Sequence, residues 1–378
     1  MTLAEAYDAV APTLRRWPDV EAHDLVAADQ SDRLILREAE PFAVDTRDIV
    51  VIGDRYGALT LSLLAALPDV RVRLHQDLIT GERALVRNAE VLGADPARIT
   101  WHDLDDTLVR DATLVLLVLP RGLDALDEIS AVIAASARDD VRVVAGGRVK
   151  HMTPSMNETL AAHFTAVHAS RGASKSRVLH ASRPTRPASE RTWPRTRRHD
   201  DVGLTLVAHG AAFAGTSLDI GTRFLLEHLG QIPHTRDAID LGCGTGALAA
   251  AYALARPGTR VIASDRSAAA VASARETMTA NGVDDRVTVV RDDGLAQQPD
   301  ASADLVLLNP PFHSGAAVTD AIAPRLFADA ARVLRPGGEL WTVWNSHLRY
   351  RPQLESIVGP TRQIARNRTF TITATTGR

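Results

Sequence analysis

Short apolar runs separated by longer mixed stretches recur along the whole chain. Four of them in the second half cover residues 238–241, 260–265, 287–293 and 303–308. Runs of this length, bounded by turn residues, are typical of parallel strands that are buried on both faces. Residues 247–252 follow a glycine-rich turn and are expected to form a helix. The pattern predicts an α/β fold built on a parallel sheet.

The first half of the chain carries the same pattern at a nearly constant distance. The paired landmarks are Gly57 with Gly246, Gln76 with Asp265, and Val118 with Asn309. The first two pairs are 189 residues apart (246 − 57 and 265 − 76), and the third is 191 apart (309 − 118). A repeat of this kind predicts two copies of one α/β unit.

The two copies differ where a ligand would bind. The first copy has Val51 for Asp240, Arg55 for Gly244, Gln76 for Asp265, Val118 for Asn309 and Arg121 for Phe312. A side chain at position 55 fills space that a glycine turn leaves open. We therefore expect the first copy to keep the fold without the reaction.

The second copy has a glycine-rich turn at residues 240–246, with the sequence Asp-Leu-Gly-Cys-Gly-Thr-Gly. Its spacing is not the Gly-x-Gly-x-x-Gly of dinucleotide-binding proteins. Gly242, Gly244 and Gly246 let a ligand come close to the backbone, and the helix that follows offers free amides. Asp240 beside the turn suits a cationic ligand better than a pyrophosphate.

Two further strands end in carboxylates. Asp265 follows the glycines by about 20 residues, the place where related α/β folds hydrogen-bond a ribose diol. Asp293 ends the next strand and is expected to accept a hydrogen bond from an adenine amine, with Asp292 as the alternative.

Asn309-Pro310-Pro311-Phe312 directly follows the last apolar run. The side-chain oxygen of Asn309 and the carbonyl of Pro310 are two acceptors for a planar amine, and Phe312 can stack on the ring that carries it. Two consecutive prolines keep such a loop stiff. A plain strand-ending turn is the alternative, since Asn-Pro and Pro-Pro are common in loops.

The composition agrees with a globular protein of two domains, with 378 residues, 45% hydrophobic and 24% charged. Cys243 is the single cysteine, which excludes a disulfide within the chain and favours a reducing cytoplasm. No apolar run has the length of a membrane span. The net charge of −3 gives no sign of nucleic-acid binding, although a local basic face remains possible.

Residues 183–200 interrupt the pattern with prolines and arginines and no apolar periodicity. We expect a linker there, between a first domain at residues 1–182 and a second at 201–378. A solvated tether is the favoured interpretation. The alternative is a phosphate-binding strap with Trp193 available for stacking.

Together, the four motifs of the second copy resemble the class I S-adenosylmethionine-dependent methyltransferases. Asn-Pro-Pro-Phe narrows the match to those that methylate exocyclic or amide nitrogens. With the degenerate copy in front, nearly the whole chain resembles the rRNA guanine-N2 methyltransferases of the RsmC and RlmG type. The segments that carry this resemblance best are Gly215–Leu226, Asn309–His313 and Gly337–Val343. Asn345–Leu348 matches more loosely, because the large-subunit members usually have Arg in place of Ser346.

The resemblance implies two tandem Rossmann-like methyltransferase domains, of which the amino-terminal one is degenerate and serves as a scaffold or positions RNA. It implies S-adenosylmethionine as cofactor and ribosomal RNA or a ribosomal subunit as partner, without a metal or a membrane. Asp219, Gly221 and Thr222 would cover the methionine end of the cofactor, and Cys243 would be a small residue of the cofactor turn. Asp219 as an ordinary helix cap is the alternative. His313 is expected to be a loop contact rather than a general base.

The implied chemistry needs little acid–base help. The N2 amine of guanine is a poor nucleophile, and two acceptors on its hydrogens favour a pyramidal nitrogen for in-line displacement. Two other functions stay open: an N-methyltransferase acting on DNA adenine or protein glutamine, and a non-catalytic RNA-binding assembly factor. The degenerate domain argues against the first, and the intact motifs argue against the second.

Overall fold

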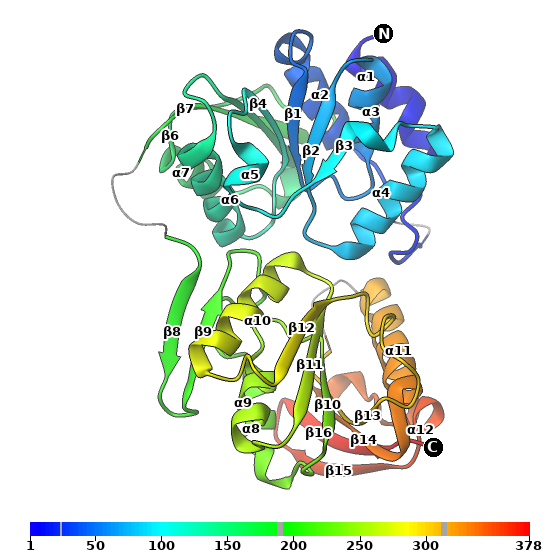
Figure 1. The fold of residues 1–378 in the computed structure, drawn as a ribbon. Helices are drawn as coiled ribbons and strands as arrows, with labels where there is room; N and C mark the ends of the chain where they lie inside the picture. Colours follow the sequence, from blue (N-terminus) through cyan, green and yellow to red (C-terminus); the bar gives the residue numbers. More distant parts are fainter. Residues whose placement is uncertain (23–24, 187–191, 311–315) are drawn as a thin grey trace. The chain divides into compact units, whose positions relative to one another are not determined.

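A computed structural model describes residues 1–22, 25–186, 192–310 and 316–378. It divides into two compact units, Met1–Trp193 and Pro194–Arg378. In each unit, helices flank a sheet of seven strands (Figure 1).

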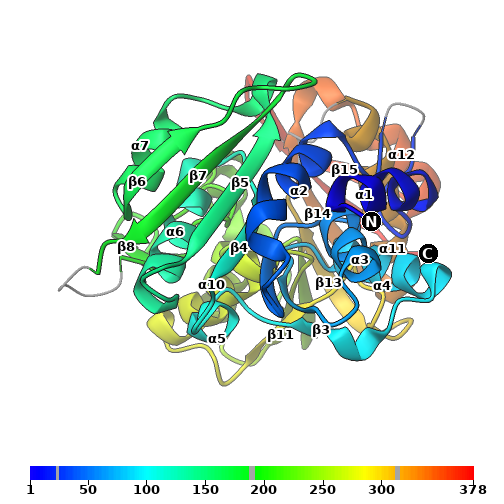
Figure 2. The same ribbon diagram turned by 90° about the horizontal axis from the view of Figure 1, so that it is seen from above.

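The strands of the amino-terminal unit are β1 (Asp48–Ile52), β2 (Arg71–His75), β3 (Ile99–Trp101), β4 (Leu114–Val118), β5 (Arg142–Arg148), β6 (Phe164–Ala169) and β7 (Ser176–Pro184). Its helices are α1 (Leu3–Val10), α2 (Gln30–Ala43), α3 (Ala58–Ala66), α4 (Ile79–Leu92), α5 (Asp106–Val109), α6 (Leu123–Ser136) and α7 (Ser155–Ala161), with the 3-10 turns η1 (Ala11–Thr13), η2 (Pro96–Arg98) and η3 (Val149–His151). The strand order is β3-β2-β1-β4-β5-β7-β6. Strand β7 lies between β5 and β6 (Figure 2) and runs antiparallel to both.

The carboxyl-terminal unit contains β8 (Arg195–His199), β9 (Leu204–Ala208), β10 (Asp237–Leu241), β11 (Arg260–Asp265), β12 (Val287–Arg291), β13 (Ala303–Leu308), β14 (Leu334–Asn345), β15 (Thr361–Arg366) and β16 (Phe370–Thr376). Its helices are α8 (Ile220–Leu226), α9 (Ala247–Ala255), α10 (Ala268–Asn281), α11 (Ala316–Val333) and α12 (Arg351–Ile357), with the 3-10 turns η4 (Leu229–Gln231) and η5 (Ser346–Leu348). The sheet order, β12-β11-β10-β13-β14-β16-β15, repeats that of the first unit.

The strand register confirms the internal repeat. Asp48 lies opposite Arg71, and Asp237 lies opposite Arg260 at the same offset of 189 residues (237 − 48 and 260 − 71). On the other side, Val51 pairs with Leu116 and Asp240 pairs with Leu307. This second pairing makes the last residue of β4 the counterpart of the residue that follows β13. Two α/β units of one topology are therefore present, as the sequence predicts.

Each sheet is buried on both faces, which explains its continuous apolar strands. Along β1, Ile49 and Val51 belong to the core under α1–α4, whereas Val50 and Ile52 belong to the core under α5–α7. Alternation of side chains along a strand sends successive residues to opposite faces. The second sheet repeats this division between the core that includes α9 and α10 and the core that includes α11 and α12.

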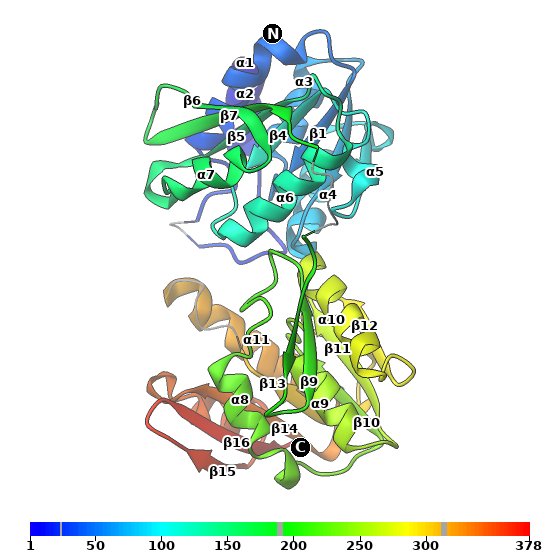
Figure 3. The ribbon, with the colours of Figure 1, turned by 90° about the vertical axis from the view of Figure 1, so that its left-hand side faces the viewer.

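The structure differs from the expected linker at residues 183–200. Strand β7 extends to Pro184, and β8 forms an antiparallel hairpin with β9, which packs against α10 (Figure 3). Trp193 is buried, and its indole N–H donates to the Asp127 carboxylate over 2.8 Å. The alternative in which Trp193 is available to stack on RNA bases is therefore wrong, because the ring belongs to the amino-terminal unit.

Candidate active site

Asn309 follows the last residue of β13, at the carboxyl edge of the second sheet. Its side-chain nitrogen donates to Asp219 Oδ2 over 2.8 Å and to Thr222 Oγ1 over 3.0 Å. A carboxylate only accepts hydrogen bonds, so the amide must turn its nitrogen toward Asp219. Asn309 Oδ1 is left buried, with no partner among the described residues. A buried acceptor of this kind is suited to an incoming donor, because leaving it unpaired costs free energy.

Asp219 and Thr222 come from the first turn of α8. Asp219 is the N-cap of this helix and accepts a hydrogen bond from the Thr222 amide over 3.0 Å. A Cβ on Gly221 would lie 3.1 Å from Asp219 Oδ2 and 3.4 Å from Asn309 Oδ1. The absence of a side chain at Gly221 therefore leaves room beside the free acceptor. The capping role is observed, and a cofactor contact for Asp219 and Thr222 stays a prediction.

The glycine turn between β10 and α9 has two open positions and one closed position. Gly242, Gly244 and Gly246 have φ angles of 72°, 54° and 80°, which favour glycine. A Cβ on Gly242 or Gly244 would meet nothing within 4 Å. A Cβ on Gly246 would lie 2.5 Å from the Met278 side chain of α10. Packing therefore accounts for Gly246, whereas the other two glycines leave space that a ligand can occupy.

Asp240 is buried beneath this turn, with 1% of its surface exposed. Its Oδ2 accepts the Ala249 amide, at the start of α9, over 2.9 Å, and its Oδ1 has no partner among the described residues. Burial raises the pKa of Asp240 to about 7, and the nearby Asp265 adds to this rise. A positively charged group beside Oδ1 would favour the ionised carboxylate.

The raised pKa of Asp240 predicts how stability depends on pH. In the unfolded chain this carboxyl loses its proton near pH 4, but in the folded protein it keeps it until about pH 7. Between these values the unfolded state binds fewer protons, so the contribution of Asp240 to the free energy of unfolding falls as pH rises. We expect Asp240→Asn to reduce this fall when urea unfolding is measured without ligand at pH 4.5 and 7. Parallel pH dependences in the two proteins would contradict the shifted pKa.

Asp265, at the end of β11, accepts two backbone amides. The Gly244 amide donates to Oδ2 and the Ser267 amide to Oδ1, each over 2.9 Å. The same side chain thus holds the glycine turn and the start of α10 together, and its contact with ribose hydroxyls stays a prediction.

Asp293 and Asp292 differ in their surroundings. Asp292 is fully buried and accepts the amides of Asp293 and Gln297 over 2.8 and 2.7 Å, inside its own loop. Asp293 pairs with the guanidinium of Arg325 on α11 through Oδ2. Asp293 is therefore the better candidate for a ligand contact. Arg325 cannot be recognised from the sequence, because nothing in the pattern links α11 to the end of β12.

The other residues predicted from the sequence contribute less to the described site. Cys243 is buried, and burial together with nearby Asp265 and Asp240 raises the pKa of its thiol, so a reactive thiolate is disfavoured. Pro310 is buried directly after Asn309. Phe312 and His313 lie outside the residues that the structure describes.

In the equivalent turn of the amino-terminal unit, Arg55 is exposed, and the buried side chains on either side of it form hydrogen bonds within the unit. Tyr56 is buried, donates its hydroxyl to Asp19 over 2.6 Å, and has the Arg16 guanidinium 4.8 Å above its ring. Asp54 accepts the amides of Leu59 and Thr60, at the start of α3, over 3.0 and 2.6 Å. Thr60 has the same place in α3 that Ala249 has in α9 (249 − 60 = 189). A carboxylate three residues further along the turn has thus replaced the one missing at position 51.

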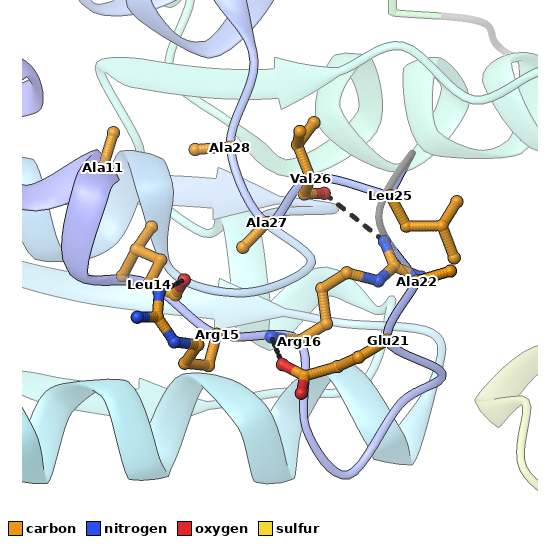
Figure 4. A pocket seen from close by; sticks show the side chains of 10 residues that line it. All are labelled: Ala11, Leu14, Arg15, Arg16, Glu21, Ala22, Leu25, Val26, Ala27 and Ala28. Carbon is orange, nitrogen blue, oxygen red and sulfur yellow. Dashed lines mark hydrogen bonds between the residues drawn. The ribbon is translucent and has the colours of Figure 1, made fainter.

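An open cavity of about 530 Å³ also lies in the amino-terminal unit, between η1 and α2 (Figure 4). Its wall is largely small and apolar. Arg16 donates to the Val26 carbonyl over 3.4 Å, and the Arg16 amide donates to Glu21 over 3.2 Å. These polar groups satisfy one another, and none is a counterpart of the residues around Asn309. The cavity is therefore not a candidate active site.

Two family models match the chain. One, described as "RLMG N-terminal domain", matches residues 5–185, and the other, "Methyltransferase small domain", matches residues 203–374. Relatives named "Ribosomal RNA large subunit methyltransferase G" match nearly the full length. The protein from Pseudomonas aeruginosa is 36% identical over 360 residues, which are 95% of this chain and 96% of the relative. The chain belongs to this methyltransferase family. The protein of the same name from Streptomyces coelicolor is 36% identical over 371 residues, with the same shares covered.

A solved structure supports the fold of this methyltransferase. It is the "16S rRNA N2 G1207 methyltransferase (RsmC)" of T. thermophilus, in complex with AdoMet and guanosine. The TM-score is 0.76 at 22% identity, over 93% of this chain and 92% of the other. The predicted fold of two methyltransferase-like domains and the predicted family are therefore confirmed.

No group of three or more His, Cys, Asp or Glu side chains suited to a metal ion occurs in the described part of the methyltransferase. No helix among residues 1–22, 25–186, 192–310 and 316–378 is long and apolar enough to cross a membrane.

Proposed function

We propose that this methyltransferase transfers a methyl group from S-adenosylmethionine to the exocyclic N2 amine of a guanosine in large-subunit ribosomal RNA. The proposal is carried by the buried oxygen of Asn309, which has no partner among the described residues and is held at the sheet edge by Asp219 and Thr222. The relatives named for large-subunit rRNA and the RsmC likeness, whose title names N2 of a guanosine, support the choice of substrate.

The residues around Asn309 would act by positioning the amine. Asn309 Oδ1 and the Pro310 carbonyl accept its two hydrogens, and Phe312 stacks on the base. When the amine donates both hydrogens to these acceptors, its nitrogen becomes pyramidal, and its lone pair is less delocalised into the ring. Reaching an amine in structured RNA requires the base to leave its stack. Stacking on an aromatic side chain compensates for part of the stacking energy that the base loses. The product loses a proton readily, so this chemistry calls for neither a strong base nor a metal.

The cofactor assignments rest on groups that fit S-adenosylmethionine. When bound there, the cofactor would supply the methyl group attached to its positively charged sulfur. The sulfur would be the leaving group when the amine attacks in line. Asp240, one oxygen of which has no partner in the described part of the chain, would face the positively charged amino end of the cofactor. Asp265 would accept from the ribose hydroxyls and Asp293 from the adenine amine. Gly242, with Cys243 and Gly244, would leave room for the backbone of the cofactor.

We propose a division of labour between a degenerate domain at residues 1–182 and a catalytic domain at 201–378. The degenerate domain carries a basic edge at the carboxyl ends of β4 and β5 and just before β7, defined as Arg121, Arg148, Lys150, His151 and Lys175. Desolvation and the charges of Arg121 and Lys150 lower the pKa of His151. The lowered pKa favours the neutral form of His151, so Arg121, Arg148, Lys150 and Lys175 carry the charge of this edge, and none of the four pairs with an acidic side chain among the described residues. Such an edge suits the phosphate backbone of the substrate RNA. An rRNA substrate implies that the protein acts in the cytoplasm.

The basic edge predicts a change in the salt dependence of RNA binding. Replacing Arg121, Arg148 and Lys150 by alanine should reduce the slope of log K against log salt by about 2 to 3, because fewer counterions are released. Fluorescence anisotropy with an rRNA fragment at several salt concentrations measures this slope. The control replaces three arginines that are each paired with an acid, Arg33, Arg110 and Arg138. Equal slopes in both triple variants would contradict a positioning role for this edge.

The function itself is tested by methyl transfer from radiolabelled S-adenosylmethionine to rRNA, DNA and a glutamine-containing protein. We expect N2-methylguanosine in digested large-subunit rRNA and no label in the other two. Label on DNA adenine or protein glutamine would overturn the substrate. Tight binding of RNA without any transfer would instead indicate an assembly factor.

A further inference from the structure

We propose that Asp219 is a positioning residue that fixes the Asn309 amide with its oxygen toward the target amine. The inference rests on the proposed function, and it gives Asp219 a role on the target side of the site in place of the cofactor contact expected from the sequence. It follows from one shared oxygen atom, Asp219 Oδ2, which accepts from both the Thr222 amide and the Asn309 side chain.

The orientation of an asparagine amide is set by its partners, since its oxygen and nitrogen have almost the same shape. The Thr222 hydroxyl, 3.0 Å from Asn309 Nδ2, can donate or accept and therefore tolerates either orientation. The Asp219 carboxylate tolerates only one. Turning the amide round would bring two acceptor oxygens to 2.8 Å from each other. Asp219 is thus the partner that decides which atom of Asn309 faces the amine.

The position of Asp219 is itself fixed by the start of α8. Its carboxylate caps the helix, and the Thr222 amide holds Oδ2 in place over 3.0 Å. Thr222 is buried, and the side chain missing at Gly221 leaves space next to Asn309 Oδ1. Helix α8 therefore presents a preset acceptor to Asn309 before any substrate arrives. A nitrogen facing the target would repel the hydrogens of the amine, and the reaction would lose one of its two acceptors.

Two substitutions that both keep the helix cap separate this role from simpler ones. Serine and asparagine are both good N-caps. In Asp219→Asn, the Thr222 amide keeps an oxygen at the place of Oδ2, so the Asn309 amide stays oriented. In Asp219→Ser, the side chain is shorter, and its hydroxyl both donates and accepts, so the orientation is lost. We expect turnover within about threefold of wild type for asparagine, and about tenfold or more below it for serine.

The measurements are the turnover number and KM for rRNA, the cofactor dissociation constant by calorimetry, and the melting temperature. In Asp219→Ser we expect the turnover number to fall while the cofactor dissociation constant stays the same. Asp201→Asn is the control, because Asp201 pairs with Arg223 on the same helix without contacting Asn309. It should leave all four quantities unchanged.

Each alternative gives a different outcome. If Asp219 only caps α8, the serine and asparagine variants will both turn over like wild type, and the inference is overturned. If Asp219 binds the cofactor through its charge, both variants will bind it more weakly, which also overturns the inference. A wild-type protein that methylates no guanosine N2 would contradict the proposed function, whereas an active wild type with a fully active serine variant would contradict only the positioning role.

Discussion

Replacing Asn309 with alanine is expected to lower the turnover number about a hundredfold or more, because one preset acceptor for the target amine is lost. The affinity for S-adenosylmethionine should barely change, since Asn309 Oδ1 is assigned to the target and not to the cofactor. Single-turnover methylation of rRNA with saturating cofactor measures the first quantity, and calorimetry measures the second.

A matched control is Asn157→Ala in α7, where the asparagine side chain donates only to the local Pro154 carbonyl over 3.2 Å. This variant should behave like wild type in both assays. Near-normal turnover of Asn309→Ala would show that the Asn-Pro-Pro-Phe segment is a structural turn. A loss of cofactor affinity equal to the loss of turnover would move Asn309 to the cofactor side of the site.

Replacing Gly244 with arginine is expected to weaken cofactor binding roughly a hundredfold or more. The change copies Arg55 into the intact turn. Gly244 has a φ of 54°, where a side chain is strained, and the new side chain would enter open space that we assign to the cofactor. Its charge would also repel the positively charged sulfur. Calorimetry should find one cofactor per wild-type chain and no measurable binding to the variant.

Gly230→Arg is the control for this experiment. A Cβ on Gly230, in η4, would also meet nothing within 4 Å, but this glycine lies outside the cofactor turn. It should bind one cofactor with unchanged affinity. Two equivalent sites in the wild type would mean that the degenerate turn around Arg55 still binds the cofactor, and would contradict the assignment of a single site.

The features that could be predicted from the sequence are those that each strand encodes locally. A strand buried on both faces is apolar along its length, so its end can be recognised in the sequence. The polar residue there can be recognised too, whether it is the last residue of the strand (Asp265) or the one after it (Asn309). The offset between the two copies also survives, because buried strands tolerate few changes. The register of β4 and β13 makes Val118 the position equivalent to Asn309, as the repeat predicts.

The features that were missed depend on contacts between distant segments. The bond between Asn309 and Asp219 spans 90 residues, and neither side chain signals the other. Strand β8 has four exposed residues followed by one buried residue, so its arginines show no apolar alternation and suggest a linker. It forms because β9, which is largely buried, offers a backbone edge with which it pairs. Asp54 stands in the turn of the first copy, but the sequence does not show that its carboxylate accepts the first amides of α3, because that depends on where the helix begins.

The carboxylates of Asp54 and Asp240 also limit how a duplicated domain can drift once selection for its ligand is relaxed. The amide of the third residue of α3 points into the protein and needs an acceptor, whether or not a cofactor is ever bound. Mutations that remove an acid at position 51 are therefore tolerated only with an acceptor elsewhere in the turn. In ligand-free descendants of this fold, we expect the acidic residue to move along the turn and not to disappear. Such a displaced acid is a sequence mark by which silent copies can be recognised.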